Sequence, residues 1–546
     1  MFRLGLLAAA VWAVAASFAC AAPLEVYGRL PNIERVAISP DGSALCIVWT
    51  DGAQRRLIVQ TAADHKLIGA FDVGAAKIRS VQWAGNDHVI LTSSRTGTIM
   101  GVDAARAEWR IAFDLNLKTK KLHGLLGDTA EALNVVIDAP EVRVVDGKPV
   151  VYLQGVHFEQ HQGVNTLYRI NLDSDASKQV EVGFEGARDW VLDPDGVAIS
   201  QLVFNDRSGK WTLKQKINGL WRDTKSPTLD ETPDMLGLGR DGHSILMREL
   251  KDGEADLREV SPDGTWGAPL RLQEADEVIF DPVRHNLIGY YALVGDRGHY
   301  TFFDPADQAL WDGVAAAYPN QGVELMSWSD DHRKMVVRVD SATEGVAFAV
   351  VNLDTRQAAW LGGEYEKIGP MDVAPVKPVK FKAADGLELS GYLTAPRGKD
   401  LKSLPLIVFP HGGPAARDDL GFDWWAQAMA SRGYAVLQVN FRGSDGYGWK
   451  FLSAGFGEWG RKMQTDISDG VAVLAKNGIV DPHRVCIAGG SYGGYAALAG
   501  VTVQNGLYRC AASYGGVTAL RDLLNDIADR DRWRGERYEE PALRLR

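Results

Sequence analysis

The sequence predicts a β-propeller over residues 22–371, followed over residues 372–546 by a unit with a mainly parallel sheet covered by helices. Two observations predict this order. In the first part, turn signals recur at a spacing typical of propeller blades, and short apolar runs flank them. In the second part, apolar strands alternate with stretches of helical periodicity. A chain of 546 residues with 46% hydrophobic and 24% charged residues has room for two such globular domains.

The first 21 residues differ from the rest of the chain. Arg3 is their only charge, an apolar run fills residues 4–16, and the small residues Ala19-Cys20-Ala21 close the segment. This layout predicts a signal peptide over residues 1–21, cleaved after Ala21, and an exported protein that is periplasmic or secreted. The apolar run is shorter than the roughly 20 residues that cross a bilayer, so no membrane span is expected. A lipid anchor at Cys20 is the weaker alternative, because the residues before it fit a lipid-attachment motif poorly.

Charge and cysteine content exclude several functions. Lys and Arg number 59 against 70 Asp and Glu, and a net charge of -11 argues against a nucleic-acid partner. No cofactor and no metal are predicted, and the oligomeric state is left open. Once the signal peptide has been removed, Cys46, Cys486 and Cys510 remain, and each lies in an apolar run. The sequence therefore predicts three buried free thiols.

The propeller prediction depends on the spacing of turns. Ser39-Pro40-Asp41-Gly42 and Asp193-Pro194-Asp195-Gly196 both fit a type I turn, and degenerate versions begin at positions 85, 127, 239, 281 and 329. The gaps between successive starts are 46, 42, 66, 46, 42 and 48 residues. Five of the six match a blade of roughly 40–50 residues, so seven blades are expected. The long gap holds a further hairpin signal at residues 144–147, and Ser261-Pro262-Asp263-Gly264 falls outside the register.

After residue 372 the period changes. A hairpin is expected over residues 379–394 on either side of an Asp385-Gly386 turn. Four strands are then expected at residues 406–409, 435–439, 485–488 and 511–514, with helices at residues 424–431, 467–476 and 495–503.

The chemistry is expected at the end of one of these strands. Gly489-Gly490-Ser491-Tyr492-Gly493 has the form G-x-S-x-G and stands between an apolar strand and a helix-compatible run. This is the context of the nucleophile elbow of an α/β-hydrolase, and it predicts Ser491 as the catalytic nucleophile. Small residues must flank the serine because the turn is sharp, and this explains Gly489 and Gly493.

A second motif supports the first. His411-Gly412-Gly413-Pro414 directly follows an earlier strand, where this fold places part of its oxyanion hole. The backbone N–H groups of Tyr492 and Gly413 are the expected oxyanion donors. Gly412 and His411 are expected to shape the loop, with His411 bracing it and not acting as a base. The alternative for this motif is a plain surface turn.

These residues resemble the prolyl oligopeptidase family of serine peptidases. The similar segments are residues 490–495, the His411-Gly412-Gly413-Pro414 loop, Asn440-Phe441-Arg442-Gly443-Ser444 and Gly457-Glu458-Trp459-Gly460 with Asp466. The loop is most similar to the acylaminoacyl-peptidase and bacterial dipeptidyl-peptidase-like branches. The resemblance implies cleavage of short peptides through Ser491 without a metal, with the propeller as a size filter. It implies that Asn440 and Arg442 shape the loop beneath the site.

One departure concerns the triad, which in this fold runs Ser, then Asp or Glu, then His. Fifty-five residues follow Ser491, none of them is His, and the last histidine, His483, precedes the strand that leads to Ser491. The prediction is therefore an α/β-hydrolase domain that lacks its C-terminal part and with it the triad Asp and His, so that this chain is impaired as a catalyst. Two alternatives are an esterase that uses the same site and a propeller-based protein that binds peptides without cleaving them.

Overall fold

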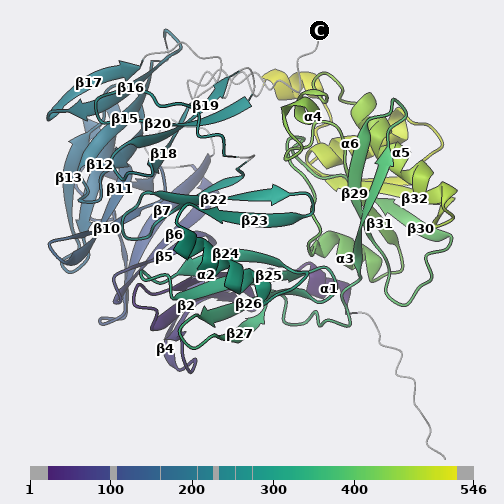
Figure 1. Cartoon of the computed structure of the whole chain (residues 1–546), viewed down its shortest axis with the longest axis horizontal. Helices are drawn as coiled ribbons and strands as arrows, with labels where there is room; N and C mark the ends of the chain where they lie inside the picture. Colours follow the sequence, from purple (N-terminus) through teal and green to yellow (C-terminus); the bar gives the residue numbers. More distant parts are fainter. Residues whose placement is uncertain are drawn as a thin grey trace, which may run out of the picture.

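The computed structural model describes residues 22–98, 107–159, 162–205, 207–225, 233–251, 254–272 and 275–525. The expected signal peptide at residues 1–21 and the segment after residue 525 lie outside the described residues. Figure 1 shows a ring of antiparallel sheets beside a second domain, in which helices pack on a single twisted sheet. The predicted order, a β-propeller followed by an α/β-hydrolase domain, is confirmed by this arrangement and by the solved structures compared below.

Seven successive antiparallel units form the ring in the described part of the chain. The first comprises β1 (Ile33–Ile38), β2 (Ala44–Thr50), β3 (Arg55–Thr61) and β4 (Leu67–Gly74). The second and third share one nine-stranded sheet, made of β5 (Lys77–Ala84), β6 (His88–Gly97), β7 (Ala107–Asn116), β8 (Lys121–Gly124), β9 (Ala132–Val136), β10 (Glu141–Val145), β11 (Lys148–Glu159), β12 (Gln162–Asn171) and β13 (Ala176–Val182).

The remaining four blades follow in chain order. The fourth comprises β14 (Ala187–Leu192), β15 (Ala198–Asn205), β16 (Lys210–Ile217) and β17 (Leu220–Lys225), and the fifth β18 (Asp234–Leu238), β19 (Ile245–Lys251) and β20 (Glu254–Val260). The sixth comprises β21 (Glu277–Phe280), β22 (Leu287–Val294) and β23 (Arg297–Phe302). After helix α2 (Pro305–Ala316), the seventh comprises β24 (Gly322–Trp328), β25 (Lys334–Ser341), β26 (Gly345–Asn352) and β27 (Gln357–Gly363).

The predicted turns lie between the first and second strands of a blade, except for the one expected at Gly127. The turns at residues 39–42, 193–196 and 239–242 each join the first strand of a blade to the second. The turn expected at Gly127 does not, because it lies between β8 and β9. In the third blade this place is taken by the hairpin at Asp146-Gly147, where β10 and β11 pair from Glu141↔Tyr152 to Val145↔Lys148. The turn residues alone do not show which of the two turns, at Gly127 or at Asp146-Gly147, begins the blade. Only the pairing of the strand that follows each turn distinguishes them.

The ring closes by side-chain packing between the first and seventh blades. Ile38 and Leu45 of the first blade share an apolar cluster with Val336 and Phe348 of the seventh. Backbone contacts support the closure, since the N–H of Asp330 donates to the carbonyl of Pro40. The sheet of the first blade contains only β1–β4, so the described strands of the two blades remain in separate sheets.

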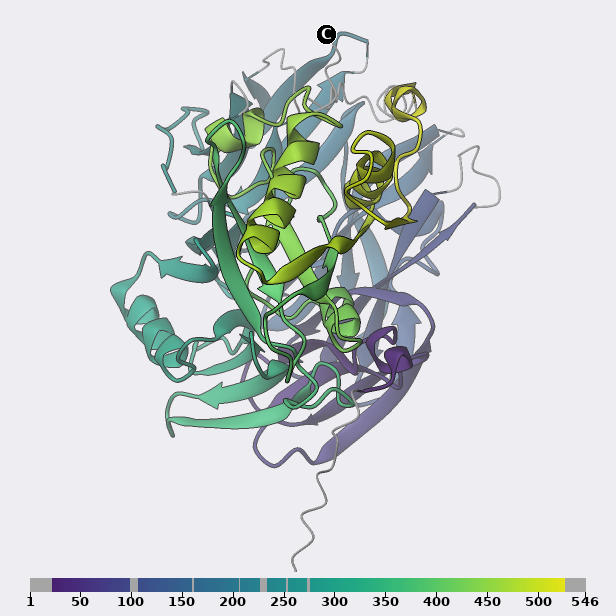
Figure 2. The ribbon, with the colours of Figure 1, turned by 90° about the vertical axis from the view of Figure 1, so that its right-hand side faces the viewer.

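The second domain has a six-stranded sheet in the order β28-β29-β31-β30-β32-β33. Its strands are β28 (Val376–Lys382), β29 (Glu388–Thr394), β30 (Leu404–Val408), β31 (Ala435–Asn440), β32 (Val480–Gly490) and β33 (Cys510–Tyr514). The first two form the expected hairpin, and the last three pairings of the sheet are parallel. The helices are α3 (Trp424–Ala430), α4 (Trp449–Ser453), α5 (Lys462–Lys476) and α6 (Tyr492–Thr502). Figure 2, a view turned by 90°, shows helices on both sides of this sheet.

The prediction of three free thiols was wrong for two of them. Cys46 is a buried free cysteine, whereas Cys486 and Cys510 form a disulfide. The two residues lie opposite each other where β32 pairs with β33. Apolar surroundings in the sequence suggested inert thiols, but the strand register brings the two Cα atoms within 4.8 Å. The disulfide ties the edge strand β33 to the strand that carries Ser491.

The two domains meet at the turn between β22 and β23 of blade six and at the C-terminal end of β25 in blade seven. Arg417 donates from Nη2 to the carbonyl of Gly295 at 2.6 Å, and Tyr392 donates from Oη to Asp296 Oδ1 at 2.7 Å. The N–H of Phe422 donates to Asp340 Oδ1 at 3.0 Å. A short N-terminal helix, α1 (Leu24–Tyr27), packs on α3 of the second domain. No helix in the described ranges is long and apolar enough to cross a bilayer.

Candidate active site

Ser491 occupies a sharp turn between β32 and α6. Its φ of 54° and ψ of -120° lie in a region that side chains other than glycine rarely adopt. The backbone on both sides holds this conformation. The N–H of Ser491 donates to the carbonyl of Tyr514 at 3.0 Å, and the carbonyl of Ser491 accepts from the N–H of Tyr495 at 3.0 Å. The side chain of Ser491 is exposed to solvent, as a nucleophile for an external substrate must be.

Glycines allow the turn to pack closely. A Cβ on Gly493 would lie 2.1 Å from the carbonyl oxygen of Pro410, and a Cβ on Gly489 would lie 2.5 Å from the backbone of Gly493. Real Cβ atoms do not approach backbone this closely, so both positions require glycine. The G-x-S-x-G pattern thus has a steric cause in this structure. Gly493 also fixes the distance between the turn and the strand that ends at Val408.

The predicted oxyanion loop lies against Ser491. A Cβ on Gly412 would be 3.5 Å from Ser491 Cβ and 3.4 Å from the carbonyl oxygen of Gly490. Gly413 follows with a φ of 115° and is exposed, and Tyr492 begins helix α6 next to the serine. The structure therefore brings the two predicted motifs together. The donor roles of the Gly413 and Tyr492 N–H groups stay predictions, as does the role of Ser491.

His411 is positioned as a brace. Its Nε2 lies 2.9 Å from Ser444 Oγ and its Nδ1 lies 2.7 Å from the carbonyl oxygen of Gly412, while its ring stacks on Phe441 with centroids 4.4 Å apart. Burial lowers the pKa of His411 to about 4, so the ring is neutral near pH 7. Both ring nitrogens face the loop and its neighbour, and this favours the bracing role expected from the sequence.

Asn440 and Arg442 each form hydrogen bonds that hold the chain beneath the site. Asn440 accepts the N–H of Asp418 at Oδ1 (2.8 Å) and donates from Nδ2 to the carbonyl of Asp418 (3.0 Å), which secures the chain that continues from the oxyanion loop. Arg442 is buried and makes charged hydrogen bonds to Asp466, at 2.7 Å from Nε and from Nη2, and to Asp385, at 2.9 and 3.0 Å. The guanidinium holds the pKa of the Asp385 carboxyl below its usual range.

Sequence reasoning missed three side chains near the loop. Burial raises the pKa of Asp418 well above its usual range, and Gln438 donates to this carboxyl at 3.0 Å. Tyr447 Oη contacts Ser390 Oγ at 2.6 Å and accepts from Asn440 Nδ2 at 2.7 Å. Arg417 lies 4.4 Å above the Tyr447 ring and reaches the propeller. No sequence signal marks these residues, because their partners are distant in the chain.

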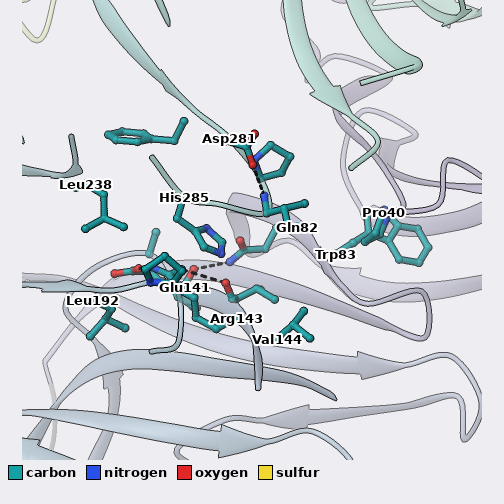
Figure 3. A pocket seen from close by; sticks show the side chains of 18 of the residues that line it. Pro40, Gln82, Trp83, Glu141, Arg143, Val144, Leu192, Leu238, Asp281 and His285 are labelled. Carbon is teal, nitrogen blue, oxygen red and sulfur yellow. Dashed lines mark hydrogen bonds and ion pairs between the residues drawn. The ribbon is translucent and has the colours of Figure 1, made fainter. Parts of the chain in front are cut away.

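A cavity of about 770 Å³ lies on the axis of the propeller, and every blade contributes to its wall. The wall is formed by first strands and the turns after them, and the domain contacts are made by turns at the opposite end of the blades. Glu141 accepts from Arg143 Nη2 at 2.6 Å, with His285 beside the pair (Figure 3). Burial raises the pKa of Asp189 in this wall to about 7. No residue of the second domain lines the cavity.

Fold and site together define an α/β-hydrolase domain with a propeller before it. Residues 420–542 match the prolyl oligopeptidase family, so the resemblance seen in the motifs is confirmed. The chain is 27% identical to the dipeptidyl aminopeptidase BIII of Pseudoxanthomonas mexicana over 96% of this chain and 78% of that protein. It is 45% identical to the dipeptidyl peptidase family member 6 of Caenorhabditis elegans over 22% of this chain and 16% of that protein. Residues 420–542 thus match a family of serine peptidases, and both relatives are named as peptidases.

Solved structures show the same fold. An acylaminoacyl peptidase of Pyrococcus horikoshii aligns with a TM-score of 0.64 at 16% identity, over 96% of this chain and 84% of that one. A puromycin-hydrolyzing peptidase of Mycobacterium tuberculosis aligns with a TM-score of 0.62 at 18% identity, over 93% of this chain and 81% of that one. At these identities the comparison supports the two-domain architecture alone.

Proposed function

We propose that this chain is an exported serine peptidase that acts on short peptides through an acyl-enzyme on Ser491. The observation that carries the proposal is the strained, exposed Ser491 at the end of β32, with the Gly412-Gly413 loop against it. A hydroxyl on such a turn, beside backbone N–H groups and a helix N-terminus, suits acyl transfer, because negative charge develops next to those donors. The relatives named as dipeptidyl aminopeptidase and dipeptidyl peptidase favour short peptides as substrates.

The disulfide supports the export part of the proposal. Disulfides persist in oxidising compartments such as the periplasm or the extracellular space. The Cys486–Cys510 bridge and the signal-peptide pattern of residues 1–21 therefore agree on the same compartment.

Labelling with a fluorophosphonate probe tests the nucleophile. The probe should modify Ser491 and no other serine of the folded chain, and Ser491→Ala should abolish the label. Ser403→Ala is the matched control, because Ser403 is exposed but directly precedes β30, which runs parallel to β32, so it lies at the opposite end of the strands from Ser491. Equal labelling after Ser491→Ala would overturn the assignment, whereas a folded protein that takes up no label would show that Ser491 is not activated in this chain.

Turnover is a separate measurement, since the residues after His483 include no histidine to act as the general base. Release of product from an aminoacyl amide identifies a peptidase, whereas hydrolysis of an acyl ester alone identifies an esterase. Equal peptide binding by wild type and Ser491→Ala, with no product from either, identifies a peptide-binding protein. Labelling without turnover would show a competent elbow that lacks its base.

A further inference from the structure

The first described residue of the chain is anchored in an unusual way for a terminus. Ala22 directly follows the predicted cleavage point and is only 7% exposed. Its N–H donates to Asp372 Oδ1 at 3.3 Å, and its carbonyl accepts from Arg432 Nη2 at 2.6 Å. Chain termini are usually loosely held unless they are tied down. Here one residue is tied on both sides of its backbone, by partners about 350 and 410 positions away.

The anchoring groups come from three parts of the molecule. Asp372 belongs to the linker between β27 and β28, Arg432 follows α3, and Tyr27 closes α1. Figures 1 and 2 show α1 beside α3 at the junction of the two domains, in agreement with their contacts. The residues that contact Ala22 therefore lie at the junction of the two domains, and the first described residue is held there.

The charged groups that contact Ala22 have no oppositely charged partner among the described residues. In the described part of the chain, neither Asp372 nor Arg432 forms an ion pair within 4 Å; Asp372 accepts only N–H groups, from Ala22 and from Gly369. Tyr27 is 1% exposed, and Ser431, Asp372 and Arg432 lie near its hydroxyl. Burial raises the pKa of Tyr27, and the charge of Asp372 acts in the same direction, whereas Arg432 acts against it. Asp372 therefore accepts from neutral donors alone among the described residues, and a positive charge beside it would form a stronger, charged hydrogen bond.

Cleavage between Ala21 and Ala22 would supply that charge. Hydrolysis of this peptide bond consumes one water and leaves a carboxylate on Ala21 and an amine on Ala22, which takes up a proton near neutral pH. The neutral N–H that now faces Asp372 becomes an ammonium with three donors and a positive charge. Charged hydrogen bonds are shorter and about twice as strong as neutral ones.

We propose that removal of residues 1–21 creates a structural ion pair, in which the new α-ammonium of Ala22 binds Asp372 and thereby fastens the start of the propeller to the linker and to α3. This rests on the export part of the proposed function and not on catalysis by Ser491. Removal of residues 1–21 then adds an ion pair to the junction of the two domains, besides separating the protein from its signal peptide. Arg432 fixes the carbonyl of the same residue, so the ammonium is held at one position.

The pH dependence has a definite sign. A free α-amino group has a pKa of roughly 8, and a carboxylate partner raises it in the folded state. The stabilisation is therefore complete below about pH 8 and is lost as the pH rises through the raised value. Asp372 from the linker accepts from the nitrogen of Ala22, and Arg432 from the end of α3 donates to the carbonyl of the same residue, with Tyr27 of α1 and Ser431 close to these two groups. Asp372 is the only carboxylate among these four.

The test compares four chains in a double-mutant cycle. One chain begins at Ala22 with a free amine, a second carries Gly-Ser before Ala22, and each is also made with Asp372→Asn. The chain that begins at Ala22 should melt about 2 °C higher than the extended chain at pH 6.5, and the difference should vanish near pH 10 and in the Asp372→Asn pair. Asp400→Asn, at an exposed carboxylate nearby in the sequence, is the matched control and should leave the difference intact.

Amine labelling gives a readout that does not depend on melting. An amine-selective acylating reagent at pH 7 should modify Ala22 at least tenfold more slowly in the wild type than in Asp372→Asn. Equal labelling rates, or a melting difference that persists in Asp372→Asn, would overturn the ion pair. The mass of the exported protein should correspond to a chain that begins at Ala22, and any other start would overturn the processing step. Each result is independent of whether Ser491 hydrolyses a substrate.

Discussion

The two domains bury their apolar side chains in different ways. The hydrolase domain collects most of them in one large cluster that joins the sheet to α5 and α6. The propeller divides its own among several clusters, each of which lies mainly between two neighbouring blades. Stability in a blade array is close to a sum of neighbour contacts, whereas a single core couples every element around it. Damage should therefore stay local in the propeller and spread in the hydrolase domain.

Arg442→Ala gives the sharpest test of this difference. The substitution leaves Asp466, whose side chain is 0% exposed, without its charged partner in the hydrolase domain. Breaking a buried pair on one side costs about 3–5 kcal/mol, and the loss should appear in urea unfolding together with reduced labelling of Ser491. Arg484→Ala removes an exposed pair of the same domain and should cost about 1 kcal/mol or less. Equal costs for the two variants would contradict the picture of one coupled core.

Reduction of the disulfide should have the next largest effect. Cys486 and Cys510 close a loop with a sequence separation of 24, for which loop entropy predicts a loss of roughly 3 kcal/mol in the free energy of unfolding. Cys510→Ser, at constant reductant, should reproduce the effect. Cys46 of the propeller is the contrasting thiol, since burial raises its pKa to about 12 and should prevent alkylation of the native protein. Alkylation of Cys46 before unfolding would show that the blades open more readily than the hydrolase sheet.

Asp189→Asn tests a propeller residue through pH. Asp189 accepts hydrogen bonds from Gln154 Nε2 and from the N–H of Trp190 at the same oxygen, and an asparagine can keep both. Because burial raises the folded pKa to about 7, the wild type loses stability as the pH rises from about 4 to 7. The variant should lack this slope and should be more stable at pH 8, by at most about 1.4 kcal/mol for each unit of pKa shift, with no difference at pH 3.5. An unchanged slope would show that Asp189 ionises freely, and labelling of Ser491 should be unaffected in either case.

The smallest effect is expected from one glycine of the propeller. Gly313 lies inside α2, and no atom outside its own helix lies within 4 Å of a Cβ placed there. Gly313→Ala should raise the free energy of unfolding by up to about 1 kcal/mol, because alanine is the better helix former. Gly493→Ala makes the same chemical change at the elbow and should abolish labelling of Ser491, because its Cβ would meet the carbonyl of Pro410. If both changes were tolerated, the close approach at the elbow would not be required.

Most of the fold and the position of Ser491 could be predicted from local sequence patterns. The G-x-S-x-G turn, the strand before it and the helix after it are contiguous, so Ser491 was found without tertiary information. The blades were predicted because each contains its own turn, and the error at Gly127 arose where two turns compete within one long repeat. The turns predicted the number of blades but not how the ring closes, since the closing cluster that contains Ile38 and Val336 joins opposite ends of the propeller.

Contacts between distant segments were the part that sequence could not supply. The pairing of Cys486 with Cys510 depends on the register of two parallel strands, and no local signal fixes that register. Arg442 joins Asp385 and Asp466 from either side of its own position in the chain, and Asn440 holds Asp418 from 22 positions away. Each of these groups becomes recognisable only after the sheet order is known.

The closure of the ring has a mechanical consequence. Apolar packing joins the first and seventh blades without a common sheet, so the ring has a seam, and separating its two sides breaks no row of ladder hydrogen bonds. Both chain segments that leave this seam, Ala22 and the linker with Asp372, end on the hydrolase domain. The hydrolase domain therefore bridges the joint at which the propeller begins and ends, and its contacts with both segments help to keep the ring closed.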